Sequence, residues 1–229
     1  MFEQLFATLD THRRPSSVAR IGGFRPDTRE VHSWFGGNFV IQPDELWPSY
    51  ERKPMLPVLQ IRVDELPVIP PQLEDVALLG LFVTQGRLPS DFPSANGEGW
   101  TIRTYPSLQG MVRATPPPDA EALRPFQVRW DLEENEGPDW LEILEILDDP
   151  SIGVNNDFFE ACQGRYHKHS FTKVGGWPAT IQQALHRVND PFVFQVASEE
   201  KPRWMLADNG NMYFFADTRN HWSMYWDCY

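Results

Sequence analysis

Apolar residues recur along this chain at two characteristic spacings. At the amino end the spacing is i, i+3, i+4 and i+7, which puts the apolar side chains on one face of a helix: Phe2, Leu5, Phe6 and Leu9. The pattern predicts a short helix over Phe2–Asp10, and Pro15 ends any extension of it.

Most other apolar runs are short, rich in branched and aromatic residues, and bounded by Pro or Gly, which is typical of strands. In the run Leu56–Val63, Leu59 and Ile61 would share one face and Gln60 would lie on the other. Similar runs predict strands over residues 38–42, 77–84, 100–105, 110–115, 126–132, 192–197, 211–216 and 221–228, with 100–105 and 110–115 paired as a hairpin.

Two further helices are predicted in the middle of the chain. Asp139 is a favourable N-cap, and Glu142 follows three residues later, as a capping box requires. The first helix should therefore run from Asp139 to about Asp148, and the second from Asn156 to about Gly164. A short helix or turn is also expected over Ala179–His186.

Three landmarks of the chain occur twice in the same order. Arg20-Ile-Gly-Gly-Phe24 reappears as Lys173-Val-Gly-Gly-Trp177, and Pro57-Val-Leu-Gln-Ile61 reappears as Pro191-Phe-Val-Phe-Gln-Val196. Gly80-Leu-Phe82 is loosely echoed by Gly210-Asn-Met-Tyr-Phe214. The sequence therefore predicts an internally duplicated α+β fold of mostly antiparallel sheets with a few short helices.

We expect one domain over residues 1–229 with two related halves, about 18–115 and 170–229. An acidic, partly helical segment, about 116–169, would join them. In this scheme Gly22 and Gly23 correspond to Gly175 and Gly176.

The repeat makes Gln60 and Gln195 equivalent, and two interpretations of these amides are open. They could grip a ligand in a cleft between the halves, together with Asp208 and Gln182. Alternatively, each amide could tie down a loop of its own half, because buried amides need hydrogen-bond partners. Asp208-Asn209-Gly210 is equally explained as a hairpin turn, which Asn-Gly favours.

Composition narrows the functional classes. The formal net charge of −12 disfavours nucleic acid as a partner, because phosphate contact needs Lys and Arg. Two cysteines, Cys162 and Cys228, form no disulfide framework and are expected to be reduced. Neither a signal peptide nor an apolar run of membrane-spanning length is recognisable, so we expect a cytoplasmic protein that does not bind membranes.

No catalytic constellation is recognisable in the sequence. His167 and His169 lie near Asp157, Glu160 and Cys162, but no second cluster completes a metal-ligand set. The chain carries neither a nucleophile elbow nor a phosphate-cradling glycine-rich loop. We therefore expect no catalytic residues, metal or cofactor, and leave open an enzyme or small-ligand site between the halves.

Acidic residues concentrate in one segment. From Asp131 to Asp149 the chain has nine acids and no Lys or Arg: Asp131, Glu133, Glu134, Glu136, Asp139, Glu142, Glu145, Asp148 and Asp149. Like charges at helical spacing repel, and two of them end the predicted helix, where its dipole disfavours them. A solvated face would tolerate this, but a basic partner would relieve it, so Glu142, Glu145, Asp148 and Asp149 are the predicted partner-binding residues.

The repeated motifs resemble those of the YwqG-like family. Ile21-Gly22-Gly23, Trp47-Pro48 and Pro54-Met55 before Leu59-Gln60-Ile61 are similar to its first half. Its second half is similar to Gly175-Gly176-Trp177-Pro178 with Ile181-Gln182, Phe194-Gln195-Val196, and Asp208-Asn209-Gly210 before Tyr213. The chain departs from the family pattern between Gly23 and Trp47, where more than twenty residues replace a short loop.

This resemblance has a functional implication. The family is bacterial and often found among polymorphic-toxin loci, where a small cytoplasmic protein neutralises a toxin. The resemblance implies a binding role of the immunity type. Together with the acidic segment, it predicts a non-enzymatic binding protein that neutralises a basic toxin or effector.

Overall fold

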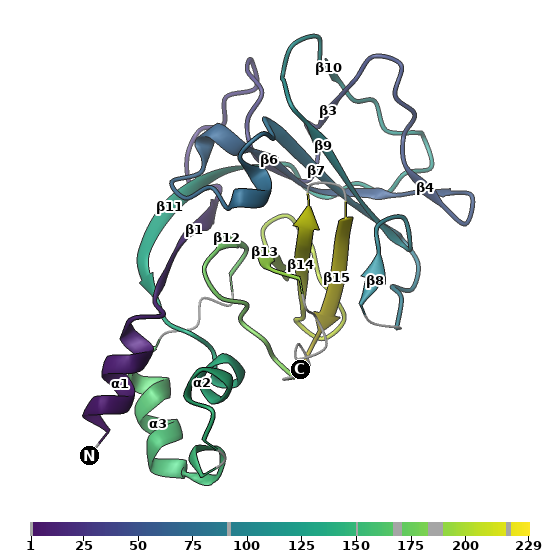
Figure 1. Ribbon diagram of the computed structural model, residues 1–229. Helices are drawn as coiled ribbons and strands as arrows, with labels where there is room; N and C mark the ends of the chain where they lie inside the picture. The colour runs from purple at the N-terminus through teal and green to yellow at the C-terminus, as the bar shows by residue number, and fades with distance from the viewer. Residues whose placement is uncertain (1, 91–92, 150, 167–170, 183–189, 219–220) are drawn as a thin grey trace.

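A curled antiparallel sheet forms most of the molecule in the computed structural model, which describes residues 2–90, 93–149, 151–166, 171–182, 190–218 and 221–229. The sheet has eleven strands in the order β8-β15-β14-β13-β12-β1-β11-β2-β6-β7-β9. It bends about its two central strands, β1 and β11, into a half-barrel, so that its two ends face each other (Figure 1).

The central strands divide this sheet into two wings. The first wing comprises β11 (Phe126–Glu136), β2 (Trp34–Phe35), β6 (Leu56–Arg62), β7 (Leu78–Val83) and β9 (Trp100–Tyr105). The second wing comprises β1 (Arg14–Ile21), β12 (Lys173–Gly175), β13 (Phe192–Ala197), β14 (Asn211–Thr218) and β15 (His221–Asp227). The short strand β8 (Ser94–Ala95) leaves the β7–β9 connection to pair with β15, and so lies at the outer edge of the second wing.

Smaller elements decorate the loops. Two separate ribbons pair β10 (Val112–Arg113) with β3 (Val40–Ile41), and β4 (Ser49–Tyr50) with β5 (Lys53–Pro54). One-turn 3-10 helices occur at η1 (Val63–Glu65), η2 (Pro71–Leu73) and η3 (Ile152–Val154).

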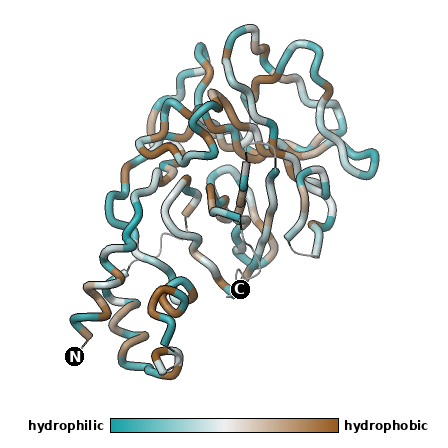
Figure 2. The backbone as a smooth tube through the Cα atoms, in the orientation of Figure 1, coloured by the Kyte–Doolittle hydropathy of each residue, from teal (hydrophilic) through white to brown (hydrophobic). Residues whose placement is uncertain are grey.

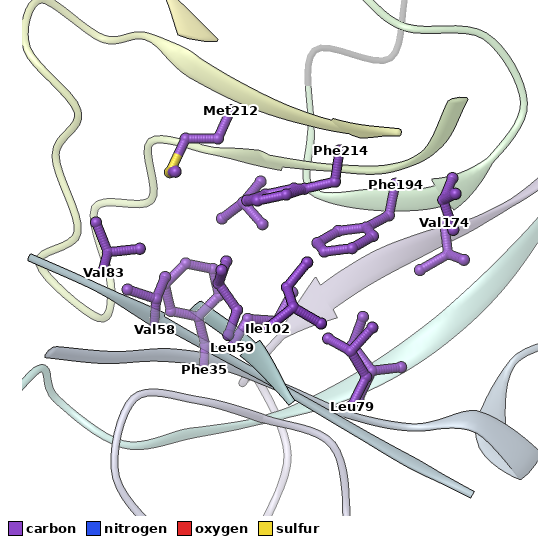
Figure 3. Close-up of a cluster of buried hydrophobic side chains, with 14 of the residues drawn as sticks. Phe35, Val58, Leu59, Leu79, Val83, Ile102, Val174, Phe194, Met212 and Phe214 are labelled. Carbon is purple, nitrogen blue, oxygen red and sulfur yellow. The ribbon is translucent and has the colours of Figure 1, made fainter. Parts of the chain in front are cut away.

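The main core fills the space between the facing wings (Figure 3). Leu59, Leu79 and Ile102 come from the first wing and meet aromatic side chains of the second. Phe214 stacks on Phe194 with ring centroids 4.4 Å apart, and Trp100 from the first wing packs edge-on against Phe214 at 5.4 Å. The hydrophobic effect therefore holds the bent sheet closed.

The two wings have matching strand registers. In the first wing Trp34 pairs with Gln60, Gln60 with Gly80 and Gly80 with Arg103. The second wing has a matching register across its four strands: Lys173 pairs with Gln195, Gln195 with Tyr213, and Tyr213 with Tyr225. Register shifts also occur at corresponding points, between Pro57 and Leu59 and between Phe192 and Phe194.

Three α-helices within the described residues form a separate helical lobe: α1 (Glu3–Asp10), α2 (Trp140–Leu147) and α3 (Asn156–Arg165). They lie together at one end of the molecule, away from β3 and β10 (Figure 1). A second apolar cluster holds them, with Leu9, Ile143 and Phe158 at its centre, and Figure 2 shows hydrophobic stretches both here and in the sheet. Asp10 also links α1 to Arg165 at the end of α3.

Most of the predicted elements are present. The helix at 2–10 and the helix beginning after Asp139 are confirmed, and the Asp139 side chain accepts a hydrogen bond from Trp140 N. The predicted 100–105 and 110–115 hairpin is wrong, because β10 pairs with β3 and β9 pairs with β7. Residues 179–182 are not helical, and the rest of the helix or turn predicted over Ala179–His186 lies outside the described residues.

The core between the wings should be sensitive to loss of a ring. We expect Phe214→Ala to lower the free energy of unfolding by about 3–5 kcal/mol, because it removes a fully buried ring that contacts both wings. Phe171→Ala is the matched control, since that side chain is 58% exposed, and it should cost much less. Chemical denaturation of both variants measures the difference, and equal losses would contradict this account of the core.

Candidate functional site

Gln60 and Gln195 are both buried, and each holds a loop of its own wing. Gln60 Nε2 donates to His32 O at 2.8 Å, and its Oε1 accepts from Val40 N at 2.8 Å. Gln195 repeats this arrangement with Phe171 O at 2.8 Å and Ala179 N at 2.9 Å. The amides therefore close two equivalent loops, which is the structural one of the two interpretations left open by the sequence.

The cleft predicted between the halves is not formed by these residues. Apolar side chains occupy the space between the wings, and both amides bind backbone groups of their own wings. Asp208 is exposed on the β13–β14 connection, while Gln182 N donates to Asp227 Oδ2 at 2.9 Å. Gln60, Gln195, Asp208 and Gln182 are thus structural or exposed residues and do not line one site.

The register places Gly36-Gly37, and not Gly22-Gly23 as predicted, at the position in the first wing that matches Gly175-Gly176 in the second wing. Gly36-Gly37 follows β2 and lies shortly before Val40, whose N–H binds Gln60. In the same way, Gly175-Gly176 lies shortly before Ala179, whose N–H binds Gln195. The four glycines of these two pairs, Gly36, Gly37, Gly175 and Gly176, have positive φ, which glycine adopts without strain. Gly22-Gly23 instead ends β1, where Gly22 N donates to Gln127 O at 3.2 Å.

The other motif residues also have structural roles. Trp47 Nε1 donates to Met55 O at 2.9 Å, and its ring packs edge-on against Phe82. Trp177 Nε1 donates to His12 O at 2.9 Å. At Gly210 an added Cβ would collide with the backbone of Asp227.

A buried ion pair lies where β11 and β12 meet the helical lobe. Lys173 is fully buried and contacts Glu136, which is 3% exposed. Burial lowers the pKa of Lys173, and the charge of Glu136 opposes this shift. Gly176 has no room for a side chain because Glu136 fills that space. The pair therefore packs against the start of the 176–182 segment.

The predicted acidic stripe on α2 is only partly exposed. Glu142 is half-buried and lies near Arg14. Burial lowers the pKa of Arg14, and the negative charge of Glu142 opposes that shift. Glu145, Asp148 and Asp149 are exposed. Asp149 accepts hydrogen bonds from Ser151 Oγ at 2.7 Å and Ser151 N at 2.9 Å, which lower its pKa.

Exposed apolar side chains accompany the exposed acids of the helical lobe. Val154 is 83% exposed and Phe159 is 37% exposed. Phe159 packs edge-on against Trp140 at 4.9 Å, which holds its ring in place. The lobe thus exposes both acidic and apolar side chains, and we call this set the acidic surface: Glu145, Asp148, Asp149, Val154 and Phe159.

A hollow lined by arginines lies over the central strands, and sequence reasoning missed it. Its volume is about 530 Å³, and Arg20, Arg25 and Arg129 line it together with His32 and Glu65. We call it the arginine basin. Its residues come from four separated segments, so no local motif signals it.

The two cysteines are not bonded to each other. Burial raises the pKa of the Cys162 thiol to about 11, with Arg165 opposing, so Cys162 is a packing residue of the helical lobe. His167 and His169 lie outside the described residues. Elsewhere, over the described ranges, no three His, Cys, Asp or Glu side chains gather as a metal site would need.

None of the helices in the described part of the chain has the length and apolar character needed to cross a bilayer. The sequence matches no curated protein at a significant level. It does match the model of a family described as a domain of unknown function, DUF1963, over residues 33–224. The match covers most of the chain, so the protein belongs to the DUF1963 family.

Breaking the buried ion pair should be costly. We expect Glu136→Gln to lower the free energy of unfolding by about 3–5 kcal/mol, because it removes the carboxylate that contacts the buried Lys173 and leaves only Asp139 and Glu142, whose effect on the pKa of Lys173 is smaller. The double variant K173M/E136M should recover most of this loss, since it removes both charges. Urea unfolding of the three proteins tests this, and a double variant as unstable as the single one would contradict it.

Proposed function

We propose that this member of the DUF1963 family is a non-enzymatic binding protein that docks a basic protein partner on its helical lobe. The observation that carries the proposal is the acidic surface: the same lobe exposes the acids Glu145, Asp148 and Asp149 and the apolar side chains of Val154 and Phe159. Interfaces commonly combine an apolar centre with a polar rim. A positively charged partner would complement this combination.

The local charge balance supports a basic partner. Between residues 130 and 164 the chain contains no Lys or Arg, and Asp157 and Glu160 add to the acids of the lobe. Asp148 ends α2 in a left-handed conformation, so its charge adds to the negative end of the helix dipole. Such an uncompensated field mainly speeds the encounter with a cation-bearing partner.

An immunity-like role gives this surface a biological context. The motifs around Trp47 and Gly175-Gly176 resemble the YwqG-like family, whose members are often encoded among polymorphic-toxin loci. A cytoplasmic protein that neutralises a basic toxin or effector fits both this resemblance and the acidic lobe. A small-ligand or catalytic site between the wings has less support, because the apolar core fills that space.

The acidic surface should control association with a basic partner. We expect E145Q/D148N/D149N to slow association with the purified product of the adjacent gene by at least tenfold at low salt, and to leave dissociation less affected. The fold should be retained, because these side chains are exposed and the amide oxygen introduced by D149N can still accept from Ser151. Association rates in rising salt measure the effect.

The matched control for this experiment is D44N/D119N/E121Q. It makes the same change in net charge at exposed positions outside the helical lobe. Equal slowing by both variants would show that net charge alone controls association. Unchanged association of the lobe variant would show that the interface lies elsewhere. Either result would refute docking on the helical lobe.

We also infer that the two wings descend from one duplicated unit. Support comes from the matched registers, the corresponding register shifts and the equivalent contacts of Gln60 and Gln195. A further pair of contacts agrees: Ser33 Oγ accepts from Arg62 N at 2.9 Å, and Thr172 Oγ1 accepts from Ala197 N at 3.2 Å. Unrelated sheets would not be expected to share so many side-chain details.

The duplication predicts a particular superposition. In a crystal structure of the protein, we expect Gln60 to superpose on Gln195 and Gly36-Gly37 on Gly175-Gly176 when the two wings are aligned. Misplacement of either pair relative to the aligned strands would count against a common origin.

A further inference from the structure

The arginine basin places like charges directly opposite each other across the central strands. In the β1–β11 pairing, Arg20 and Arg129 are partners, and both are exposed. Like charges at directly opposite positions of an antiparallel pair are destabilising. Arg25, from the loop after β1, lines the same hollow. The hollow thus gathers three arginines with two acids, Asp27 and Glu65, on a protein whose formal net charge is −12.

The acids around the basin are already engaged by other groups. Asp27 binds Arg29 through both carboxylate oxygens, at 3.1 and 2.7 Å. Glu65 accepts from His32 Nδ1 at 2.6 Å and from Ser33 N at 2.9 Å.

Asp131 pairs with Arg20 at 3.0 Å. Among the described residues, Arg25 and Arg129 have no carboxylate partner. The basin therefore keeps two guanidinium groups available.

The arginines lie on a fixed framework. Gln127 is buried on β11; its Oε1 accepts from Asp27 N at 2.8 Å, and its backbone O accepts from Gly22 N. At Gly22 an added Cβ would lie 2.6 Å from the ring of Phe126, so the loop is packed tightly against β11. The guanidinium of Arg129 stacks over Phe24 at 4.0 Å, which restricts its orientation. Both ends of the 22–27 loop are thus tied to the strand that carries Arg129.

We propose that the arginine basin binds a small phosphate-bearing molecule through Arg25 and Arg129, with Arg20 contributing once its pairing with Asp131 loosens. The planar guanidinium group matches the geometry of phosphate oxygens, and a dianionic phosphate resolves the repulsion across β1 and β11. The volume of about 530 Å³ suits a small molecule. The site is separate from the acidic surface of the helical lobe and does not depend on its function.

The test is calorimetric titration of the full-length protein with inorganic phosphate and with pyrophosphate at constant ionic strength. We expect saturable binding at one site, weakened at least tenfold in R25Q/R129Q. The matched control R52Q/R87Q removes the same charge from exposed arginines that do not line the basin, and it should bind as the wild type does. Thermal melts of each variant confirm that the fold is retained.

Three outcomes would overturn the proposal. They are the absence of saturable binding of either anion, equal weakening in the basin and control variants, and unchanged binding in R25Q/R129Q. Citrate at the same ionic strength distinguishes phosphate recognition from attraction to any multivalent anion. Equal binding of citrate and pyrophosphate would overturn the assignment of the site to phosphate.

Discussion

The pairing of β1 with β11 is the constraint on which the rest of the structure depends. Each strand belongs to a different wing, so the hydrogen-bonded ladder from Ser16 to Ile21 joins the two wings into one continuous sheet. Ile21, Val128 and Trp130 from these strands enter the main core. Arg20 and Arg129 are the next residues along each strand from Ile21 and Val128, so their side chains lie on the opposite face, where they line the arginine basin. One ladder therefore closes the core between the wings and assembles the charged hollow outside it.

Local signals predicted most of the secondary structure. The spacing of apolar residues identified α1, and the cap at Asp139 identified the start of α2, because both depend on neighbours in sequence. The glycine pairs show where local similarity fails. Gly22-Gly23 looks more like Gly175-Gly176 by its flanking residues, but Gly36-Gly37 lies at the matching position in the register of the first wing.

The candidate sites depended on distant contacts and were harder to predict. A helical stripe places Glu142 with the exposed acids, but Arg14 and Lys173 approach it from other elements and turn it into a structural residue. The arginine basin joins residues more than a hundred positions apart, since Arg20 and Arg129 meet only through the sheet. The sequence predicted that Gln60 and Gln195 are equivalent but could not give their contacts, which in the structure are backbone groups of their own wings.

The crossing of β8 from the first wing to the second has a consequence for solubility. The segment between β7 and β9 covers part of the outer edge of β15, opposite Ser223 and Met224. An uncovered strand edge is a template for pairing with another chain, and three of the seven residues of β15 are Trp or Tyr. A protease cut between β7 and β9 would free this cover without removing any core residue of β15. The nicked protein would then be prone to add strands from its neighbours and grow into aggregates.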